Sequence, residues 1–200
     1  MSMQAVFIDK DGTLIEDVPY NVLPERIRLA TGAGMAMRAL SDAGYALFVV
    51  SNQPGVALGR FPEAALAAVR RELCRLLAGY GVSLAGFYYC PHHPTGRVAG
   101  YSGLCNCRKP RPGMLQRAAA EHGIDLAASW LIGDILDDIE AGRRAGCRTV
   151  LLDNGHETEW RRGPGRRPHQ VAQDLPEAAA CILASSQYAT LPEPVPLCTR

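Results

Sequence analysis

The chain has 200 residues, of which 48% are hydrophobic and 20% are charged, and its formal net charge is +1. These values are typical of one soluble globular domain and give no reason to expect a nucleic acid as a partner. No apolar run is long enough to span a bilayer, and the first residues lack the apolar region of a signal peptide. We therefore expect a cytoplasmic monomer with no membrane partner.

The first turn of the chain predicts chemistry. The apolar run Ala5–Ile8 predicts a buried parallel strand, and Asp9 and Asp11 follow it directly, with Gly12 allowing a sharp turn. Two carboxylates at the end of a buried strand are costly unless a cation lies between them. The pattern predicts a hard divalent cation, Mg²⁺, with one carboxylate free to act as a nucleophile. The alternative is a plain turn, where Asp and Gly are also common.

Apolar strands and helical segments alternate along the rest of the chain. The expected further strands are 45–50, 87–89, 129–132 and 149–152, and the expected helices are 35–43, 62–79, 114–122, 137–145 and 175–184. This alternation predicts an α/β fold with a doubly wound, mostly parallel sheet and helices on both faces. We expect one domain over residues 1–184, a loop at 15–31 beside the first turn, a basic structureless loop at 161–168 and a flexible tail at 185–200.

Polar residues follow several of these strands. Ser51 follows the second strand and Asp134 the fourth, while Lys109 precedes a helix. Because ligands bind outside the carboxyl ends of the strands in such sheets, we expect these residues to meet Asp9 and Asp11 at one edge. Asp134 would complete a metal site with Asp9, Ser51 would supply a hydroxyl, and Lys109 a positive charge for phosphoryl oxygens.

The first turn, Asp9-Lys10-Asp11-Gly12-Thr13, resembles the D-x-D-G-[TV] motif of the haloacid dehalogenase superfamily of phosphatases. The resemblance implies a Rossmann-like core. It also implies that Asp9 is the nucleophile that becomes an aspartyl phosphate. Asp11 would donate a proton to the leaving oxygen, and its backbone carbonyl would help to hold Mg²⁺.

Later segments resemble the other three motifs of this superfamily. Ser51 matches the phosphate-binding residue of the second motif, and Lys109 matches the lysine of the third. Asp134 and Asp138 match the fourth, which implies that Asp134 binds Mg²⁺ and that Asp138 is a supporting acid. Ile135 departs from the pattern, because family members often carry Lys there, and this removes one charge near the phosphate.

The sequence has seven cysteines, an odd number, and three of them lie close together. Cytosolic thiols stay reduced, so a disulfide framework is the weaker interpretation. Cys90, His92, Cys105 and Cys107 make a Cys₃His set, a normal tetrahedral ligand set for Zn²⁺. Because all four positions are protein ligands, we expect a structural site that shapes its loop. Two alternatives stay open, which are His93 as a rival ligand and reduced loop cysteines without metal.

Two longer segments narrow the resemblance, and they read Tyr89-Cys90-Pro91-His92-His93-Pro94 and Cys105-x-Cys107-Arg108-Lys109-Pro110. They resemble the D-glycero-D-manno-heptose-1,7-bisphosphate 7-phosphatase family, which acts in activated-heptose synthesis for bacterial surface polysaccharide (lipopolysaccharide) and has no large cap domain. The likeness covers residues 5–155. It implies a small phosphorylated sugar as substrate, of unspecified anomer. The residues that match the family's substrate contacts are Asp17, Tyr20, Asn52, Gln53 and Arg108.

Two other functions are compatible with these motifs. Histidinol-phosphate phosphatases carry a similar zinc cluster, but their loop is usually shorter than the twelve residues between His92 and Cys105. A zinc-stabilised interaction module without catalysis is the second, although the intact motifs argue against it. A bisphosphate also needs a cation for its distal phosphate, and we expect Arg108 there because guanidinium binds phosphate bidentately.

Overall fold

The computed structural model describes residues 2–188, whose six strands form one parallel sheet in the order β3-β2-β1-β4-β5-β6. The strands are β1 Ala5–Ile8, β2 Ala46–Asn52, β3 Gly86–Cys90, β4 Trp130–Gly133, β5 Arg148–Leu152 and β6 Gln170–Ala172. The helices are α1 Ala33–Asp42, α2 Leu66–Ala78, α3 Gly113–His122, α4 Leu136–Ala145 and α5 Leu175–Tyr188. The predicted doubly wound parallel sheet is confirmed.

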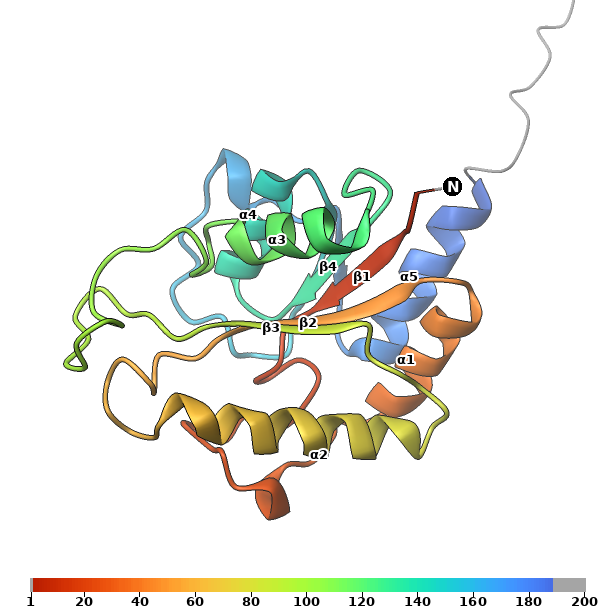
Figure 1. Ribbon diagram of the computed structural model, residues 1–200. Coiled ribbons are helices and arrows are strands. Elements are labelled where there is room, and N and C mark those ends of the chain that lie inside the picture. Colours follow the sequence, from red (N-terminus) through yellow and green to blue (C-terminus); the bar gives the residue numbers. More distant parts are fainter. Residues whose placement is uncertain (1, 189–200) are drawn as a thin grey trace, which may run out of the picture.

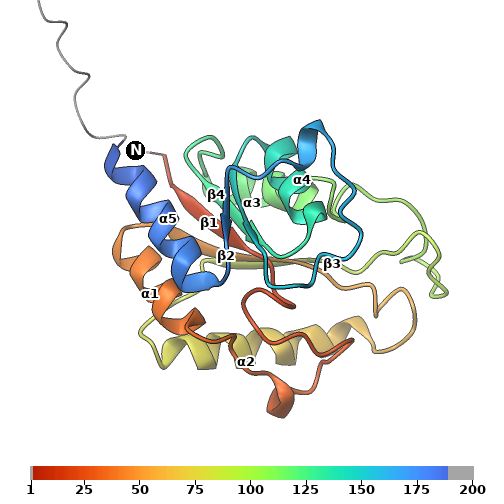
Figure 2. The same cartoon turned by 180° about the vertical axis from the view of Figure 1, so that it is seen from behind.

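Helices cover both faces of the sheet, with α1, α2 and α5 on one face and α3 and α4 on the other (Figure 1; Figure 2 shows the view from behind). The central strand β1 is buried along its whole length, because its side chains alternate between these two layers. Val6 and Ile8 join the core under α1, α2 and α5, whereas Ala5 and Phe7 join the core under α3 and α4. Because both faces of β1 are buried, the position of Asp9, the residue directly after the strand, is fixed relative to the core.

The sequence missed the last strand. Strand β6 has only three residues, and Val171 at its centre is half exposed, so neither length nor alternation marks it. Helix α5 runs on to Tyr188, past the predicted end at residue 184, and residues 189–200 of the predicted tail lie outside the described part of the chain. Helix α2 begins at Leu66, after a 3₁₀ turn at Glu63–Ala65.

The segment 161–168 is not structureless, contrary to the prediction from its composition. A 3₁₀ turn covers Pro164–Arg166, and the Arg166 guanidinium makes ion pairs of 2.6 Å with both Asp137 and Glu140. Both partners lie on α4, so this segment is held against that helix by complementary charge. A composition rich in Arg, Gly and Pro cannot reveal such partners, since they lie elsewhere in the sequence.

Long connections leave the sheet at the carboxyl ends of two strands. Residues 9–32 link β1 to α1, and residues 91–112 link β3 to α3 and extend away from the sheet (Figure 1). Within residues 2–188 no inserted cap domain interrupts the core. None of the helices in this range has both the length and the apolarity needed to cross a membrane.

Candidate active site

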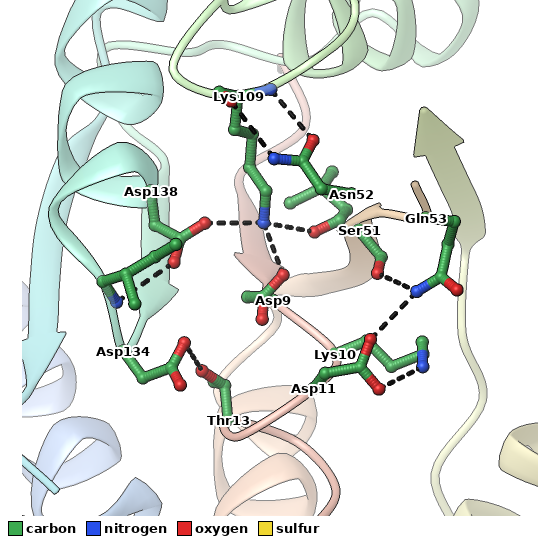
Figure 3. Close-up of polar contacts among 12 residues, drawn as sticks. Asp9, Lys10, Asp11, Thr13, Ser51, Asn52, Gln53, Lys109, Asp134 and Asp138 are labelled. Carbon is green, nitrogen blue, oxygen red and sulfur yellow. Dashed lines mark hydrogen bonds and ion pairs between the residues drawn. The ribbon is translucent and has the colours of Figure 1, made fainter. Parts of the chain in front are cut away.

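Three acids meet at the carboxyl edge of the sheet. Asp9 follows β1, Asp134 follows β4 and Asp138 lies in the first turn of α4, and one oxygen from each carboxylate lies within 4.8 Å of the others (Figure 3). All three are buried, and this burial raises the pKa of Asp9 to about 7 and that of Asp134 to about 6. A divalent cation would relieve the unfavourable charge, so this oxygen donor set fits Mg²⁺.

Lys109 places a buried positive charge among these acids. Its ammonium contacts the Asp9 carboxylate, lies 2.6 Å from Oδ1 of Asp138 and donates a 2.9 Å hydrogen bond to the Val50 carbonyl. Burial alone would lower the pKa of Lys109, but the charges of Asp138 and Asp9 raise it above its ordinary value. The side chain therefore stays charged and joins the ends of β1 and β2 to α4.

Asn52 fixes the backbone of Lys109. The Asn52 side chain donates to the Lys109 carbonyl at 3.1 Å and accepts from the Lys109 amide at 3.0 Å. These two hydrogen bonds show that Asn52 positions Lys109, and the predicted contact between Asn52 and a substrate stays a prediction.

The second carboxylate of the first motif lies on the open side of the site. Gln53 donates to Oδ2 of Asp11 at 2.9 Å and to the hydroxyl of Ser51 at 2.7 Å. The other oxygen of Asp11 accepts from the Lys10 ammonium. The side chain of Asp11 is about one third exposed, whereas Ser51 is buried at the end of β2. Asp11 is thus accessible to a bound ester.

A pocket of about 270 Å³ opens beside Asp11. Its lining residues are Asp11, Asp17, Pro19, Tyr20, Asn21, Asn52, Gln53, Pro54 and Gly55. The structure thus brings four of the predicted substrate-binding residues to one hollow. Tyr20 adopts a left-handed conformation with φ of 56°, and the guanidinium of Arg60 lies 5.5 Å from the centre of its ring.

Arg108, the fifth predicted substrate-binding residue, lies elsewhere. It lines a separate hollow of about 220 Å³ together with three further basic residues, Lys109, Arg111 and Arg144, and one acidic residue, Asp137. The Arg108 Nη1 atom is buried and makes no hydrogen bond within residues 2–188. A buried guanidinium nitrogen without an acceptor is costly, so an anion from solution would fit it.

The four predicted zinc ligands also converge. The ligand atoms of Cys90, His92, Cys105 and Cys107 all lie within 4.8 Å of one another. The sulfur of Cys107 lies 3.1 Å from that of Cys90 and 3.3 Å from that of Cys105. Tetrahedral ligands with Zn–S bonds of about 2.3 Å would lie roughly 3.8 Å apart, so these sulfur–sulfur distances would need to grow by about 0.5 to 0.7 Å to hold the ion.

His92, and not His93, belongs to this cluster. The Nδ1 atom of His92 lies 3.3 Å from the Cys107 sulfur, while Nδ1 of His93 contacts the amide and hydroxyl of Thr95. The hydrogen bond between Cys107 and Cys90 lowers the pKa of Cys107 and raises that of Cys90, because the two sulfurs share one proton. The donor set and its compactness fit Zn²⁺.

The structure adds residues that sequence reasoning missed. In the loop after β5, Nδ1 of His156 lies 2.7 Å from Oδ2 of Asp134, and the Asn154 side chain donates to the Gly12 carbonyl at 2.8 Å. These residues follow a strand of the same parallel sheet, so the rule that located Ser51 could have located them.

Comparisons with known proteins agree with this geometry. Residues 106–178 match the HAD-hydrolase-like family model. The chain is 42% identical over 151 residues to the D-glycero-beta-D-manno-heptose-1,7-bisphosphate 7-phosphatase of Yersinia pestis, a match that covers 76% of this chain and 80% of the relative. It is also 42% identical to the protein of that name from Escherichia coli (strain K12), with 76% and 79% covered.

A solved structure extends the likeness to three dimensions. The crystal structure of D,D-heptose 1,7-bisphosphate phosphatase from B. bronchiseptica, complexed with magnesium and phosphate, matches with a TM-score of 0.74 and 31% identity. The match covers 92% of this chain and 99% of that chain. Magnesium is therefore supported both by this relative and by the three carboxylates of the present chain.

Fold, site and relatives together define a phosphatase of the haloacid dehalogenase superfamily, that is, a phosphoric monoester hydrolase. The interpretation as a non-catalytic zinc module is accordingly set aside. Within the superfamily, the chain belongs to the D-glycero-beta-D-manno-heptose-1,7-bisphosphate 7-phosphatase family.

Proposed function

We propose that this protein removes the 7-phosphate of D-glycero-β-D-manno-heptose 1,7-bisphosphate during the synthesis of activated heptose. The observation that carries the proposal is the meeting of Asp9, Asp11, Ser51, Lys109 and Asp134 at one edge of the sheet. Its support from relatives is the 42% identity to enzymes named for this reaction and for the β anomer.

The proposal gives each of these side chains the role that the superfamily motifs imply. The Asp9 carboxylate attacks phosphorus, so that an Asp9–phosphorus bond forms while the bond to the sugar oxygen breaks. Asp11 gives its proton to that oxygen. Water then attacks phosphorus while Asp11 takes its proton, and the Asp9–phosphorus bond breaks, which releases inorganic phosphate and the free Asp9 carboxylate. Ser51 and Lys109 hold the phosphoryl oxygens throughout. Asp9, Asp134 and the Asp11 carbonyl would hold magnesium, with Asp138 beside them paired to Lys109. The ion would supply positive charge to the phosphoryl group.

The proposal places the sugar in one hollow and the distal phosphate in another. The pocket lined by Asp17, Tyr20 and Gln53 offers carboxylate, hydroxyl and amide groups for sugar hydroxyls beside Asp11. Arg108 is assigned to the distal phosphate, because its Nη1 atom is buried and lacks an acceptor. This second cation is what distinguishes a bisphosphate from a monophosphate substrate such as histidinol phosphate.

The proposal also includes a structural zinc ion bound by Cys90, His92, Cys105 and Cys107. In its support, the Arg108 amide donates to the Cys105 sulfur at 3.3 Å, and hydrogen bonds of this kind orient metal ligands. A cytoplasmic location, a monomeric state and one domain over residues 1–184 remain predictions.

The test is a comparison of kcat/KM for the two anomers of heptose 1,7-bisphosphate and for histidinol phosphate, with and without Mg²⁺. We expect the β anomer to give the highest value and activity to depend on Mg²⁺. A preference for histidinol phosphate would replace the proposed substrate, while activity on none of the three would remove the sugar bisphosphate assignment.

A further inference from the structure

Asp134 is held at both of its oxygens by side chains from distant parts of the chain. Thr13 donates to Oδ1 at 3.2 Å, and Nδ1 of His156 lies 2.7 Å from Oδ2. Asp134 is buried, whereas the His156 side chain is 40% exposed. The imidazole therefore covers the carboxylate from the solvent side and fixes its plane.

His156 is itself anchored at the backbone. Its amide lies 3.4 Å from the side-chain oxygen of Asn154, whose nitrogen donates to the Gly12 carbonyl at 2.8 Å. The next residue, Glu157, accepts a 2.7 Å hydrogen bond from the amide of Leu136 at the start of α4. The loop thus joins the turn after β1 to the turn after β4, which are the two turns that carry the metal-binding acids.

His156 is not a member of the group of candidate metal ligands. The group whose oxygens lie within 4.8 Å of one another consists of Asp9, Asp134 and Asp138. A nitrogen that touches a ligating carboxylate from outside such a group acts on the orientation of that carboxylate, and changing such a partner weakens metal binding by ~10- to 100-fold in other sites.

We propose that His156 is a positioning residue for the metal site, whose Nδ1–H donates to Asp134 and holds this carboxylate in the orientation that binds Mg²⁺. This inference rests on the proposed role of Asp134 as a ligand. It predicts a defect in metal affinity, with little effect on the chemical step once the metal is saturating. Asn at position 156 should preserve the function, because its amide nitrogen can occupy the place of Nδ1, whereas Gln would place it near Nε2.

The test is a titration of the purified full-length chain with Mn²⁺, with free Mn²⁺ measured by electron paramagnetic resonance. His156→Ala and His156→Gln should raise the Kd for Mn²⁺ by ~10-fold or more, and His156→Asn should stay within about threefold of the unchanged protein. At saturating metal, kcat and the KM for the phosphate ester should stay near their original values. His122→Asn is the matched control, since this histidine lies on α3 and contacts Tyr88.

Three results would overturn the proposal. The first is an unchanged Kd for Mn²⁺ in a folded His156→Ala or His156→Gln protein. The second is a Kd for His156→Asn as weak as that for Gln, which would mean that the ring itself is needed. The third is nitrogen hyperfine coupling to bound Mn²⁺, which would make His156 a ligand. Asp134→Asn tests the metal site separately from the role of His156. An unchanged Kd for Mn²⁺ in this variant would mean that Asp134 is not a ligand, and the proposed metal site would fall together with the role of His156.

Discussion

The carboxylate site and the cysteine cluster are held in different ways. Asp9 and Asp134 lie at the ends of adjacent buried strands, so the sheet brings them together. Of the cluster residues, only Cys90 lies on a strand. The other three belong to the connection 91–112, although Cys105 and Cys107 pack against the core under α3 and α4. A site built on strands keeps its geometry without its metal. A site built on a loop depends on the bound metal to shape the chain.

The two sites meet at consecutive residues. Lys109 serves the carboxylate site and is fixed by both ends of the Asn52 amide, whereas the Arg108 amide is fixed by the Cys105 sulfur. Damage to the cysteine cluster should therefore affect Arg108 before Lys109. The predictions that follow break or sharpen this division.

Asp9→Asn breaks the carboxylate site alone. Turnover should fall by at least ~10⁴-fold, because an amide cannot act as the nucleophile. The zinc content should be retained, since the cluster lies elsewhere. The protein should still unfold in one cooperative transition, with a melting temperature shifted by the loss of the buried Asp9–Lys109 ion pair. Turnover assays, elemental analysis and thermal unfolding of one preparation test this, and activity within tenfold of the original would refute the role of Asp9.

Asp11→Asn tests whether Asp11 is the proton donor in the same site. The loss should be ~10²- to 10³-fold for a sugar phosphate, because the leaving oxygen then lacks its proton donor. p-Nitrophenyl phosphate should lose much less, because its leaving group departs without a proton. Equal losses on both esters would mean that Asp11 does not act as the acid.

Cys107→Ser breaks the cysteine cluster. Zinc should be lost, and the melting temperature should fall by roughly 5–10 °C, the scale of a few kcal/mol in a chain of this size. Cys74→Ser is the matched control, because Cys74 lies on α2 outside the cluster. Elemental analysis and calorimetry test the pair, and full zinc content in the Cys107 variant would contradict the ligand assignment.

Arg108→Ala tests the residue at the junction. Turnover of heptose bisphosphate should fall by ~10- to 100-fold, the scale of a charge-assisted hydrogen-bond pair, and small monophosphate esters should lose less. Arg117→Ala, on the exposed face of α3, serves as the control. Steady-state kinetics on both substrate types tests whether Arg108 binds the distal phosphate. Equal losses of turnover on both types would assign Arg108 to the reacting phosphate.

Arg166→Ala has the smallest expected effect and lies outside both sites. It removes the two ion pairs to α4 and should lower the free energy of unfolding by ~1 kcal/mol. Arg161→Ala should change it very little, because Arg161 and its partner Glu159 are both exposed. Urea unfolding of the two variants compares them, and equal small effects would mean that the 161–168 segment is held by other contacts.

The sequence predicted five of the six strands, because each has an apolar run followed by polar residues. It also predicted the meeting of Asp9, Ser51 and Asp134, since parallel strands deliver their carboxyl ends to one edge. The two hydrogen bonds from the Asn52 side chain to the Lys109 backbone could not be predicted, because no sequence pattern tells whether a side-chain amide will bind a ligand or the backbone. For the same reason, the partners of Arg166 could not be read from a basic segment.

The packing around Gly12 limits which substitutions this chain can tolerate at that position. A Cβ atom at this position would collide with Oδ2 of Asp134 and with Nδ1 of His156, and the backbone adopts a φ of +79°. Position 12 is therefore coupled by shape to two residues more than a hundred positions away in the chain. A library that varies the loop after β5 to change substrate preference should keep Gly12 fixed, and one that varies the first turn has no freedom at this position.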